Sequence, residues 1–249
     1  NSFHPSLLPS QGEEPRRAPS PEENERITAH LQQTAANLLT EGEVSVVIGY
    51  TSGSLPGQMV PAFVTRPEEA SSLAWNEHCG NNLSVYLPQA LKRKGNGKVG
   101  IVVKSCDAKA LVGLMRENQA KREDLLLLGV PCAGVWENGR LALKCYSCPE
   151  EVSPLVDRTI TPEGAVEGPA ASGEERSVAP DPRDAQIVSL EAASPEVRWD
   201  YWQRQFERCL RCYACRAVCP LCYCETCIAE NHRPQWIRTA FDGPGNTAW

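Results

Sequence analysis

Residues 98–130, KVGIVVKSCDAKALVGLMRENQAKREDLLLLGV, contain the pattern that decides the fold. The runs VGIVV (99–103) and LLLLGV (125–130) each have the length and composition of a buried strand, and apolar residues at helical spacing lie between them. Asp107 is placed to cap this helix. A strand, a helix and a strand of these lengths predict a right-handed βαβ unit with parallel strands.

A cysteine follows each of these two strands. Cys106 comes after the first strand and Cys132 comes after the second. Open parallel sheets bind their ligands at the carboxyl ends of the strands. We therefore expect the two cysteines to converge on one edge of the sheet.

The next stretch predicts a tight hairpin, because Asn138-Gly139 stands between the apolar segments 133–136 and 141–144. A two-residue turn there gives three cross-strand pairs: Trp136 with Leu141, Gly134 with Leu143, and Cys132 with Cys145.

Cys148 follows as the second half of a C-x-x-C pair. Four cysteines can then meet although 42 positions separate the first from the last: Cys106, Cys132, Cys145 and Cys148. The alternative is that they are small apolar core residues. A C-x-x-C pair that folds back beside a third cysteine favours a metal cluster.

The residues before the βαβ unit predict further elements of the same domain. Ser20 is a suitable N-cap for an amphipathic helix over 21–39. The β-branched run 44–50 predicts a buried strand, 62–66 a second strand, and 76–95 a partly helical segment. We expect one α/β domain with a mostly parallel sheet over 20–160, preceded by a draped or disordered arm at 1–19.

Residues 209–227, CLRCYACRAVCPLCYCETC, hold seven of the twelve cysteines. The run begins with the C-x2-C-x2-C-x3-C-P spacing of bacterial ferredoxins, which aims successive thiolates at the iron atoms of a cubane cluster. These first four cysteines are Cys209, Cys212, Cys215 and Cys219, and three more follow: Cys222, Cys224 and Cys227.

This run is compatible with one cluster or with two. One cluster takes Cys209, Cys212 and Cys215 with a single later cysteine. Two clusters assign the remaining four residues to the second: Cys219, Cys222, Cys224 and Cys227. The two-cluster arrangement is favoured because it leaves no spare thiolate beside a redox centre. A structural zinc site is the alternative, and disulfides fit an oxidising compartment that the rest of the chain does not suggest.

The C-terminal part is organised as a linker at 161–193 and a ferredoxin-like, cysteine-rich module with its tail at 194–249. The run QIVSL (186–190) suggests a short strand inside the linker. Residues 194–209 predict a helix whose stripe of Trp199, Trp202 and Phe206 packs as an aromatic core beside the cluster loop. The tail carries Trp236, Phe241 and Trp249, and we expect it to pack on a partner.

The 249-residue chain has 41% hydrophobic residues and a net charge of −6. It has enough apolar residues for a packed core and no basic field that would attract nucleic acid. No apolar run approaches the roughly 20 residues of a membrane span. The N-terminus has prolines and acidic residues where a signal peptide has an apolar core. We expect a cytoplasmic protein without a membrane span.

The segment GKVGIVVKSCDAKALVGLMRENQAKREDLLLLGVPCAGVW (97–136), with KCYSCPEE (144–151) after it, resembles the beta subunits of coenzyme F420-reducing hydrogenases and F420-linked formate dehydrogenases. The resemblance covers about residues 44–160. It implies the α/β fold of that family, a 4Fe-4S cluster and commonly FAD. The ligands that it implies are the same four residues: Cys106, Cys132, Cys145 and Cys148.

The expected function is iron–sulfur electron transfer within a larger cytoplasmic oxidoreductase complex of the hydrogenase, formate dehydrogenase or heterodisulfide-reductase type. We expect two or three 4Fe-4S clusters, with FAD as a further candidate cofactor and other redox subunits as partners. No constellation for acid–base or nucleophilic catalysis stands out. The alternatives are a flavin-containing F420 or NAD(P) oxidoreductase and a zinc-stabilised scaffold subunit.

Overall fold

The computed structural model describes residues 18–137, 139–149, 151–170, 181, 183–210 and 212–225. These residues form two compact units. One contains residues 18–170, 181 and 218–221, and the other contains the described parts of 183–217 and 222–225. The arm expected at 1–19 for the most part, the tail and Cys227 lie outside the described residues. The domain limits 20–160, 161–193 and 194–249 stay a prediction.

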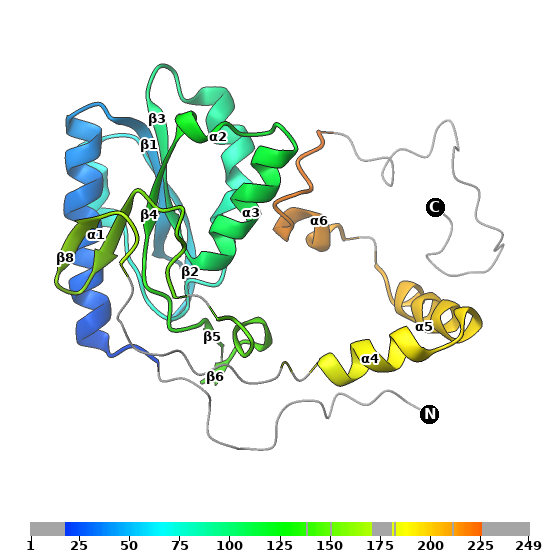
Figure 1. Cartoon of the computed structure of the whole chain (residues 1–249). Helices are drawn as coiled ribbons and strands as arrows, with labels where there is room; N and C mark the ends of the chain where they lie inside the picture. The colour runs from blue at the N-terminus through cyan, green and yellow to red at the C-terminus, as the bar shows by residue number, and fades with distance from the viewer. Residues whose placement is uncertain are drawn as a thin grey trace. The chain divides into compact units, whose positions relative to one another are not determined.

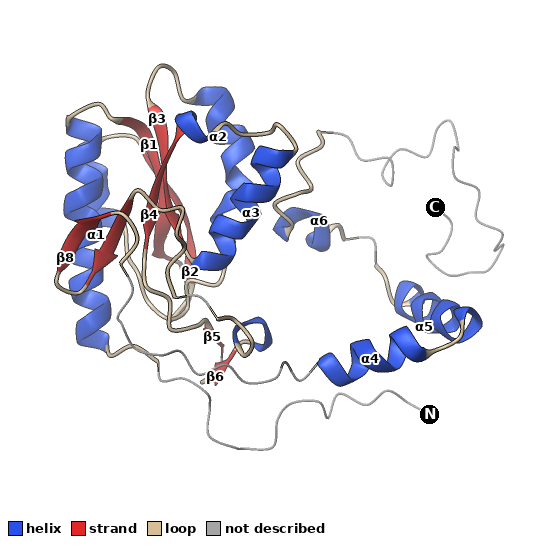
Figure 2. Ribbon diagram, in the orientation of Figure 1, coloured by secondary structure: helices blue, strands red, loops and turns tan. Residues whose placement is uncertain are grey.

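A six-stranded sheet in the order β2-β1-β3-β4-β7-β8 forms the centre of the first unit (Figure 2). The pairs β1–β3, β3–β4 and β4–β7 are parallel, while β2 and β8 pair antiparallel at the edges. The bounds of the strands are β1 Val44–Ser52, β2 Met59–Val64, β3 Lys98–Val103, β4 Leu125–Gly129, β7 Arg158–Thr161 and β8 Gly164–Glu167. This mostly parallel sheet confirms the predicted α/β fold class.

Helices cover both faces of the sheet. Figure 1 shows α1 (Pro21–Thr40) on one side and α2 (Leu87–Arg93) with α3 (Ser105–Arg116) on the other. Short 3-10 turns complete the connections: η1 Pro67–Ser72, η2 Leu83–Tyr86, η3 Arg122–Asp124 and η4 Leu143–Cys145. The central strands read as continuous apolar runs because both of their faces are covered.

Helix α1 begins where the sequence predicts. The Ser20 hydroxyl accepts a hydrogen bond from the Glu23 backbone N–H, and the Glu23 carboxylate accepts one from the Ser20 N–H. This reciprocal capping box satisfies two backbone donors at the helix start. Ile27, Leu31 and Leu38 are buried on the face that meets the sheet. The parallel pairing of the predicted βαβ unit is also confirmed, since β3 and β4 pair in parallel from Val99–Leu125 to Val103–Gly129.

The start of α3 differs from the prediction. Asp107 is inside the first turn of the helix, because α3 begins at Ser105. Its carboxylate still accepts a hydrogen bond from the Lys104 backbone N–H at 3.0 Å. Asp107 therefore stabilises the helix start from its third position and not from the N-cap.

The hairpin is shorter than predicted. Strands β5 (Trp136–Glu137) and β6 (Arg140–Leu141) pair Trp136 with Leu141 as expected. The pairs Gly134–Leu143 and Cys132–Cys145 do not form a ladder. Residues 143–145 turn into η4, where the Cys145 N–H donates to the Ala142 carbonyl, and the Cys132 N–H donates to the Glu151 carbonyl.

Three helices are described in the C-terminal half of the chain: α4 Asp184–Ala192, α5 Pro195–Glu207 and α6 Ala214–Val218. The strand predicted at 186–190 is wrong, because these residues lie inside α4. Helix α5 confirms the helix predicted there, and Ser194 caps it by accepting from the Val197 N–H.

The aromatic stripe of α5 does not form a buried core. Trp199, Trp202 and Phe206 are 57%, 51% and 45% exposed. In the described part of the chain, no helix combines the length and apolar character needed to cross a membrane.

Candidate metal centre

The four cysteines predicted to converge line one cavity of the α/β unit, the cysteine cavity. Its complete lining is Lys104, Ser105, Cys106, Cys132, Gly134, Val135, Lys144, Cys145 and Cys148. These residues come from the carboxyl ends of β3 and β4 and from the turn at η4. The edge of a parallel sheet thus brings together cysteines that are distant in the sequence, as expected.

Backbone amides of the segment after β4 point at two of the thiols. The Val135 N–H lies 3.4 Å from Cys145 Sγ, and the Gly134 N–H is a hydrogen-bond partner of Cys132. The backbone N–H groups of two consecutive residues therefore donate hydrogen bonds to cysteines on two different segments. Hydrogen bonds to sulfur favour the thiolate, which is the form that binds metal.

Burial opposes ionisation of the same thiols. Burial raises the pKa of Cys106 to about 12 although this residue is exposed at the rim, and it also raises the pKa of Cys132. The nearby charge of Asp107 adds to the effect on Cys106. Thiols in such a site ionise readily when a metal cation displaces the proton. The set is therefore suited to a metal group and poorly suited to a free thiolate nucleophile.

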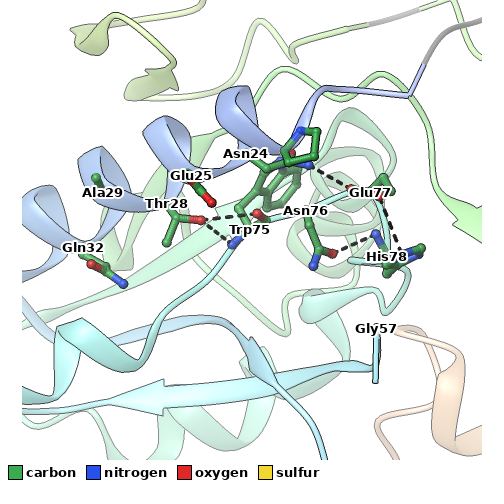
Figure 3. Close-up of a pocket in the computed structure, with 11 residues that line it drawn as sticks. Asn24, Glu25, Thr28, Ala29, Gln32, Gly57, Trp75, Asn76, Glu77 and His78 are labelled. Carbon is green, nitrogen blue, oxygen red and sulfur yellow. Dashed lines mark hydrogen bonds and ion pairs between the residues drawn. The ribbon is translucent and has the colours of Figure 1, made fainter. Parts of the chain in front are cut away.

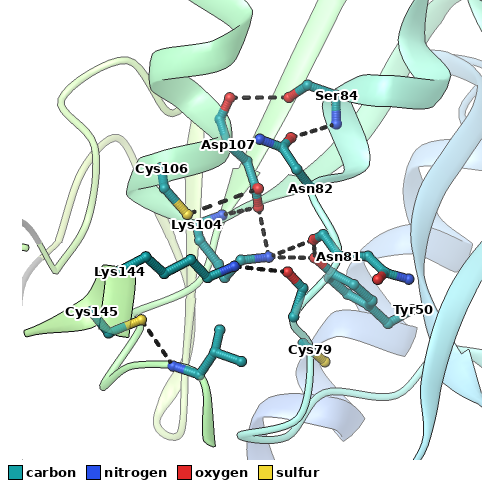
Figure 4. Close-up of polar contacts among 12 residues, drawn as sticks. Tyr50, Cys79, Asn81, Asn82, Ser84, Lys104, Cys106, Asp107, Lys144 and Cys145 are labelled. Carbon is teal, nitrogen blue, oxygen red and sulfur yellow. Dashed lines mark hydrogen bonds and ion pairs between the residues drawn. The ribbon is translucent and has the colours of Figure 1, made fainter. Parts of the chain in front are cut away.

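A buried lysine, Lys104, directly follows β3 and lines the cysteine cavity (Figure 4). Lys104 is 2% exposed, and its ammonium group lies 2.8 Å from Asp107 Oδ2 and 3.0 Å from the Asn81 carbonyl, with the Tyr50 hydroxyl as a third partner. An ammonium has three donors. All three are committed, so Lys104 organises the site and has no hydrogen bond left for a ligand.

Lys144 joins the hairpin segment to the loop that carries Asn81. Its ammonium group donates to the Gly80 carbonyl at 3.1 Å (Figure 4). Its charge lowers the pKa of the Cys106 thiol, although burial outweighs this effect. The cavity thus has a lysine at its rim that favours negative charge near Cys106.

Ser105 has a buried hydroxyl with no hydrogen-bond partner. The residue is 3% exposed and lines the cysteine cavity. Burying an unsatisfied polar group costs about 1–3 kcal/mol. An uncommitted donor beside four cysteine thiols fits a group that carries hydrogen-bond acceptors, and inorganic sulfide is such an acceptor.

The size of the cavity separates the candidate occupants. It encloses about 60 Å³, room for roughly four water molecules. This volume is far below the roughly 300–1,000 Å³ of pockets that hold organic cofactors such as a flavin. Among the described residues, no three His, Cys, Asp or Glu side chains are close enough together to hold one metal ion.

A second cavity of about 490 Å³, the α1 cavity, lies between α1 and residues 75–78 (Figure 3). Its polar side chains are largely bonded to neighbours: Asn24 Nδ2 donates to Glu77 Oε2 at 2.8 Å, and the Thr28 hydroxyl both accepts from and donates to the Trp75 backbone. His78 Nδ1 lies 2.8 Å from the Trp136 carbonyl. No cysteine lines this cavity.

The remaining cysteines lie elsewhere. Cys79 is buried beside Asn76, and burial raises its pKa to about 12. Cys215 is on α6, and the Arg216 guanidinium donates to the Cys224 carbonyl at 2.5 Å. The ligand sets predicted for the C-terminal run stay predictions, as does the set in the cysteine cavity.

Two features of the site were not predicted from the sequence. The network of Tyr50, Asn81 and Lys104 joins a residue of β1, a residue of a loop and the residue that follows β3. Each of these stretches looks ordinary when it is considered alone. Ser105 gave no signal because its missing partner is visible only in the packed structure.

No model of a known protein family matches the chain. Among curated proteins, the beta subunit of F420-dependent formate dehydrogenase 1 from Methanococcus maripaludis is 21% identical over 280 positions, which cover 76% of this chain and 70% of the relative. The F420-dependent formate dehydrogenase beta subunit from Methanocaldococcus jannaschii is 20% identical over 275 positions, with coverages of 78% and 72%. The chain is a distant relative of these beta subunits.

This relationship confirms the resemblance stated from the segments 97–136 and 144–151. A solved structure, the F420-reducing [NiFe] hydrogenase complex from Methanosarcina barkeri, contains a chain that is 15% identical with a TM-score of 0.45, covering 69% of this chain and 81% of that one. The names of the formate dehydrogenase relatives state that they are subunits. They say nothing of iron–sulfur clusters.

Proposed function

We propose that the chain is an iron–sulfur electron-transfer subunit of a larger oxidoreductase complex, and that the cysteine cavity holds a 4Fe-4S cluster. The ligands are the four cysteines that line it: Cys106, Cys132, Cys145 and Cys148. The C-terminal cysteine run holds one or two further clusters. The general role, that of a subunit of an oxidoreductase complex, agrees with the names of the beta-subunit relatives.

The observation that carries the proposal is the shared cavity. Cysteines from three segments, 42 positions apart at the extremes, line one space too small for a flavin. Backbone amides already point at two of them, and Ser105 offers an uncommitted hydroxyl. Each of these features fits an anionic cluster that needs thiolate ligands and hydrogen-bond donors.

A cluster of this kind takes up and releases one electron at a time. The protein side chains fix its position and its surroundings. Gly134 and Val135 direct their amides to the sulfur ligands, and the bonded ammonium of Lys104 holds the loop at Asn81 against the strand ends. Cys106 is exposed, so the centre lies near enough to the surface to exchange electrons with a partner.

The test is the metal content of the full chain, purified and reconstituted without oxygen. Cys145→Ser removes a ligand and should lower the iron content by about four atoms per chain. The remaining iron should stay with the C-terminal run. Cys79→Ser is the matched control, because Cys79 is buried but does not line the cavity. It should keep the iron content of the unaltered chain.

Two results would contradict the proposal. Zinc in place of iron in the unaltered protein would make the chain a zinc-stabilised scaffold. Iron content that is the same with and without Cys145→Ser would return the four cysteines to an ordinary role in the core.

A further inference from the structure

We propose that Ser105 donates a hydrogen bond to a sulfur atom of the cluster and thereby raises its reduction potential. The inference rests on the proposed function, since it needs a cluster in the cysteine cavity. It adds a positioning residue that is not a ligand and that none of the sequence motifs indicates.

The Ser105 hydroxyl is buried without a hydrogen-bond partner. Ser105 is 3% exposed, and its Oγ has no hydrogen-bond partner. The residue lines the same cavity as the four cysteines. Buried hydroxyl groups are hydrogen-bonded in the large majority of cases. The missing partner is accounted for if the cavity is filled by a group with acceptor atoms.

The position of Ser105 in α3 differs from that of a capping serine. Ser20 and Ser194 stand at the N-caps of α1 and α5, and their hydroxyls accept from the backbone of the first turn. Ser105 is one residue further along, as the first residue of α3. The Asp107 carboxylate already accepts a hydrogen bond from the Lys104 backbone N–H at this helix start. The hydroxyl of Ser105 is therefore not used for capping.

The other hydrogen-bond donors at the cavity already have partners. The Lys104 ammonium has three bonded partners, and the Lys144 ammonium is tied to Gly80. The backbone N–H groups of Gly134 and Val135 donate hydrogen bonds to the sulfur atoms of two of the cysteines. Ser105 contributes a side-chain donor that is not committed. It also lies at the N-terminus of a 12-residue helix, whose dipole favours an anion at the same place.

The chemical consequence follows from charge. Reduction adds one negative charge to the cluster, so a hydrogen bond to its sulfur is stronger in the reduced form than in the oxidised form. Such a bond stabilises the reduced form and raises the potential. Removing the hydroxyl should therefore make the cluster harder to reduce.

The experiment compares three proteins: the unaltered full chain, Ser105→Ala and Ser105→Thr. Each is loaded with iron in the absence of oxygen and then titrated electrochemically. Electron paramagnetic resonance follows the reduced clusters during the titration. Ser105→Ala should keep its iron and lower one of the cluster potentials. We expect about a tenfold fall in the reduction equilibrium constant, which is about 59 mV for a one-electron couple. Ser105→Thr keeps the hydroxyl and should stay close to the unaltered potential.

Two further measurements separate a hydrogen bond from a general disturbance. Ser84→Ala removes a buried hydroxyl that already has a partner, the Asp107 carbonyl at 3.0 Å, and should leave the potentials unchanged. Electron–nuclear double resonance after exchange into D2O should detect a deuteron coupled to the reduced cluster, and this signal should be lost in Ser105→Ala.

The outcomes distinguish this inference from the proposed function. An unaltered protein that binds no cluster through the four cysteines overturns both. A protein that keeps its cluster, with the same potentials in Ser105→Ala as in the unaltered chain, overturns the role of Ser105 alone. Loss of iron from both Ser105 variants would also overturn it, because the residue would then be needed for the fold.

Discussion

Lys104 shows how a single residue fixes the geometry of the site. Burial lowers the pKa of its ammonium group, but the charge of Asp107 and the hydrogen bonds outweigh this effect, so the pKa lies above its ordinary value. The group is charged at neutral pH and depends on its partners. Removing one partner of a buried ion pair leaves an uncompensated charge, which is strongly destabilising.

We predict that Lys104→Met destabilises the unloaded protein by about 3–5 kcal/mol, because Asp107 is then buried without its cation. Lys98→Met is the matched control, since Lys98 is exposed at the start of β3, and it should change stability by less than about 0.5 kcal/mol. Denaturant unfolding measures both. The double variant Lys104→Met with Asp107→Asn should recover part of the loss. Equal effects of the two lysine substitutions would contradict this account of Lys104.

The sequence indicated the four cysteines of the cavity but not the lysine network. Cys106 and Cys132 were found because they follow apolar runs that predict parallel strands, and parallel strands end at one edge. Tyr50 and Asn81 are 54 and 23 positions from Lys104. No periodicity links these three residues, so their contact follows only from the packing of β1, β3 and the intervening loop.

At the scale of elements, the end of β4 is closely packed against the chain that leads to β7. A Cβ atom added to Gly129 would lie 2.7 Å from Val156 Cγ1 and 3.1 Å from Val156 Cβ. The second atom is fixed to the backbone and cannot swing aside. The glycine therefore allows the segment before β7 to approach the sheet next to the cysteine cavity.

We expect Gly129→Ala to destabilise the protein by about 1–3 kcal/mol, the typical cost of overpacking. Val156→Ala alone should also destabilise, because it removes buried methyl groups. The two changes together should cost less than their sum, since the smaller residue at 156 makes room for the new methyl group. A double-mutant cycle from denaturant unfolding gives this coupling. Strict additivity would show that the close contact does not limit the substitution.

Prediction of elements succeeded where a long pattern had one interpretation and failed where a short one had two. The runs of β3 and β4 are continuous and apolar, which suits strands covered on both faces. The run 186–190 has five residues, and periodicity cannot assign so short a run to a strand or a helix. It lies in α4, where Ile187 and Val188 are half exposed or more. The hairpin turn was predicted correctly at Trp136–Leu141, but the 3-10 turn η4 ended the ladder before Cys145.

At the scale of the whole molecule, the proposed function leaves the number of clusters to the C-terminal cysteine run. Cys215 lies on α6, while Cys222 and Cys224 lie in a non-helical segment whose carbonyl at Cys224 is bound by Arg216 of α6. In an extended segment, alternate residues point to the same side about 6–7 Å apart. This spacing lets both cysteines reach one cluster when the chain curls around it, as the two-cluster hypothesis requires.

The last prediction counts iron in the full chain. Two clusters in the C-terminal run and one in the cysteine cavity give about twelve iron atoms per chain, whereas a single C-terminal cluster gives about eight. The double variant Cys222→Ser and Cys224→Ser removes two ligands that only the second C-terminal cluster needs. It should therefore lose about four iron atoms, while Cys79→Ser again serves as the control. The two-cluster hypothesis would be wrong if the unaltered chain bound about eight iron atoms and the double variant kept all of them. Cys222 and Cys224 would then be spare thiols beside a redox centre, where they are open to oxidation.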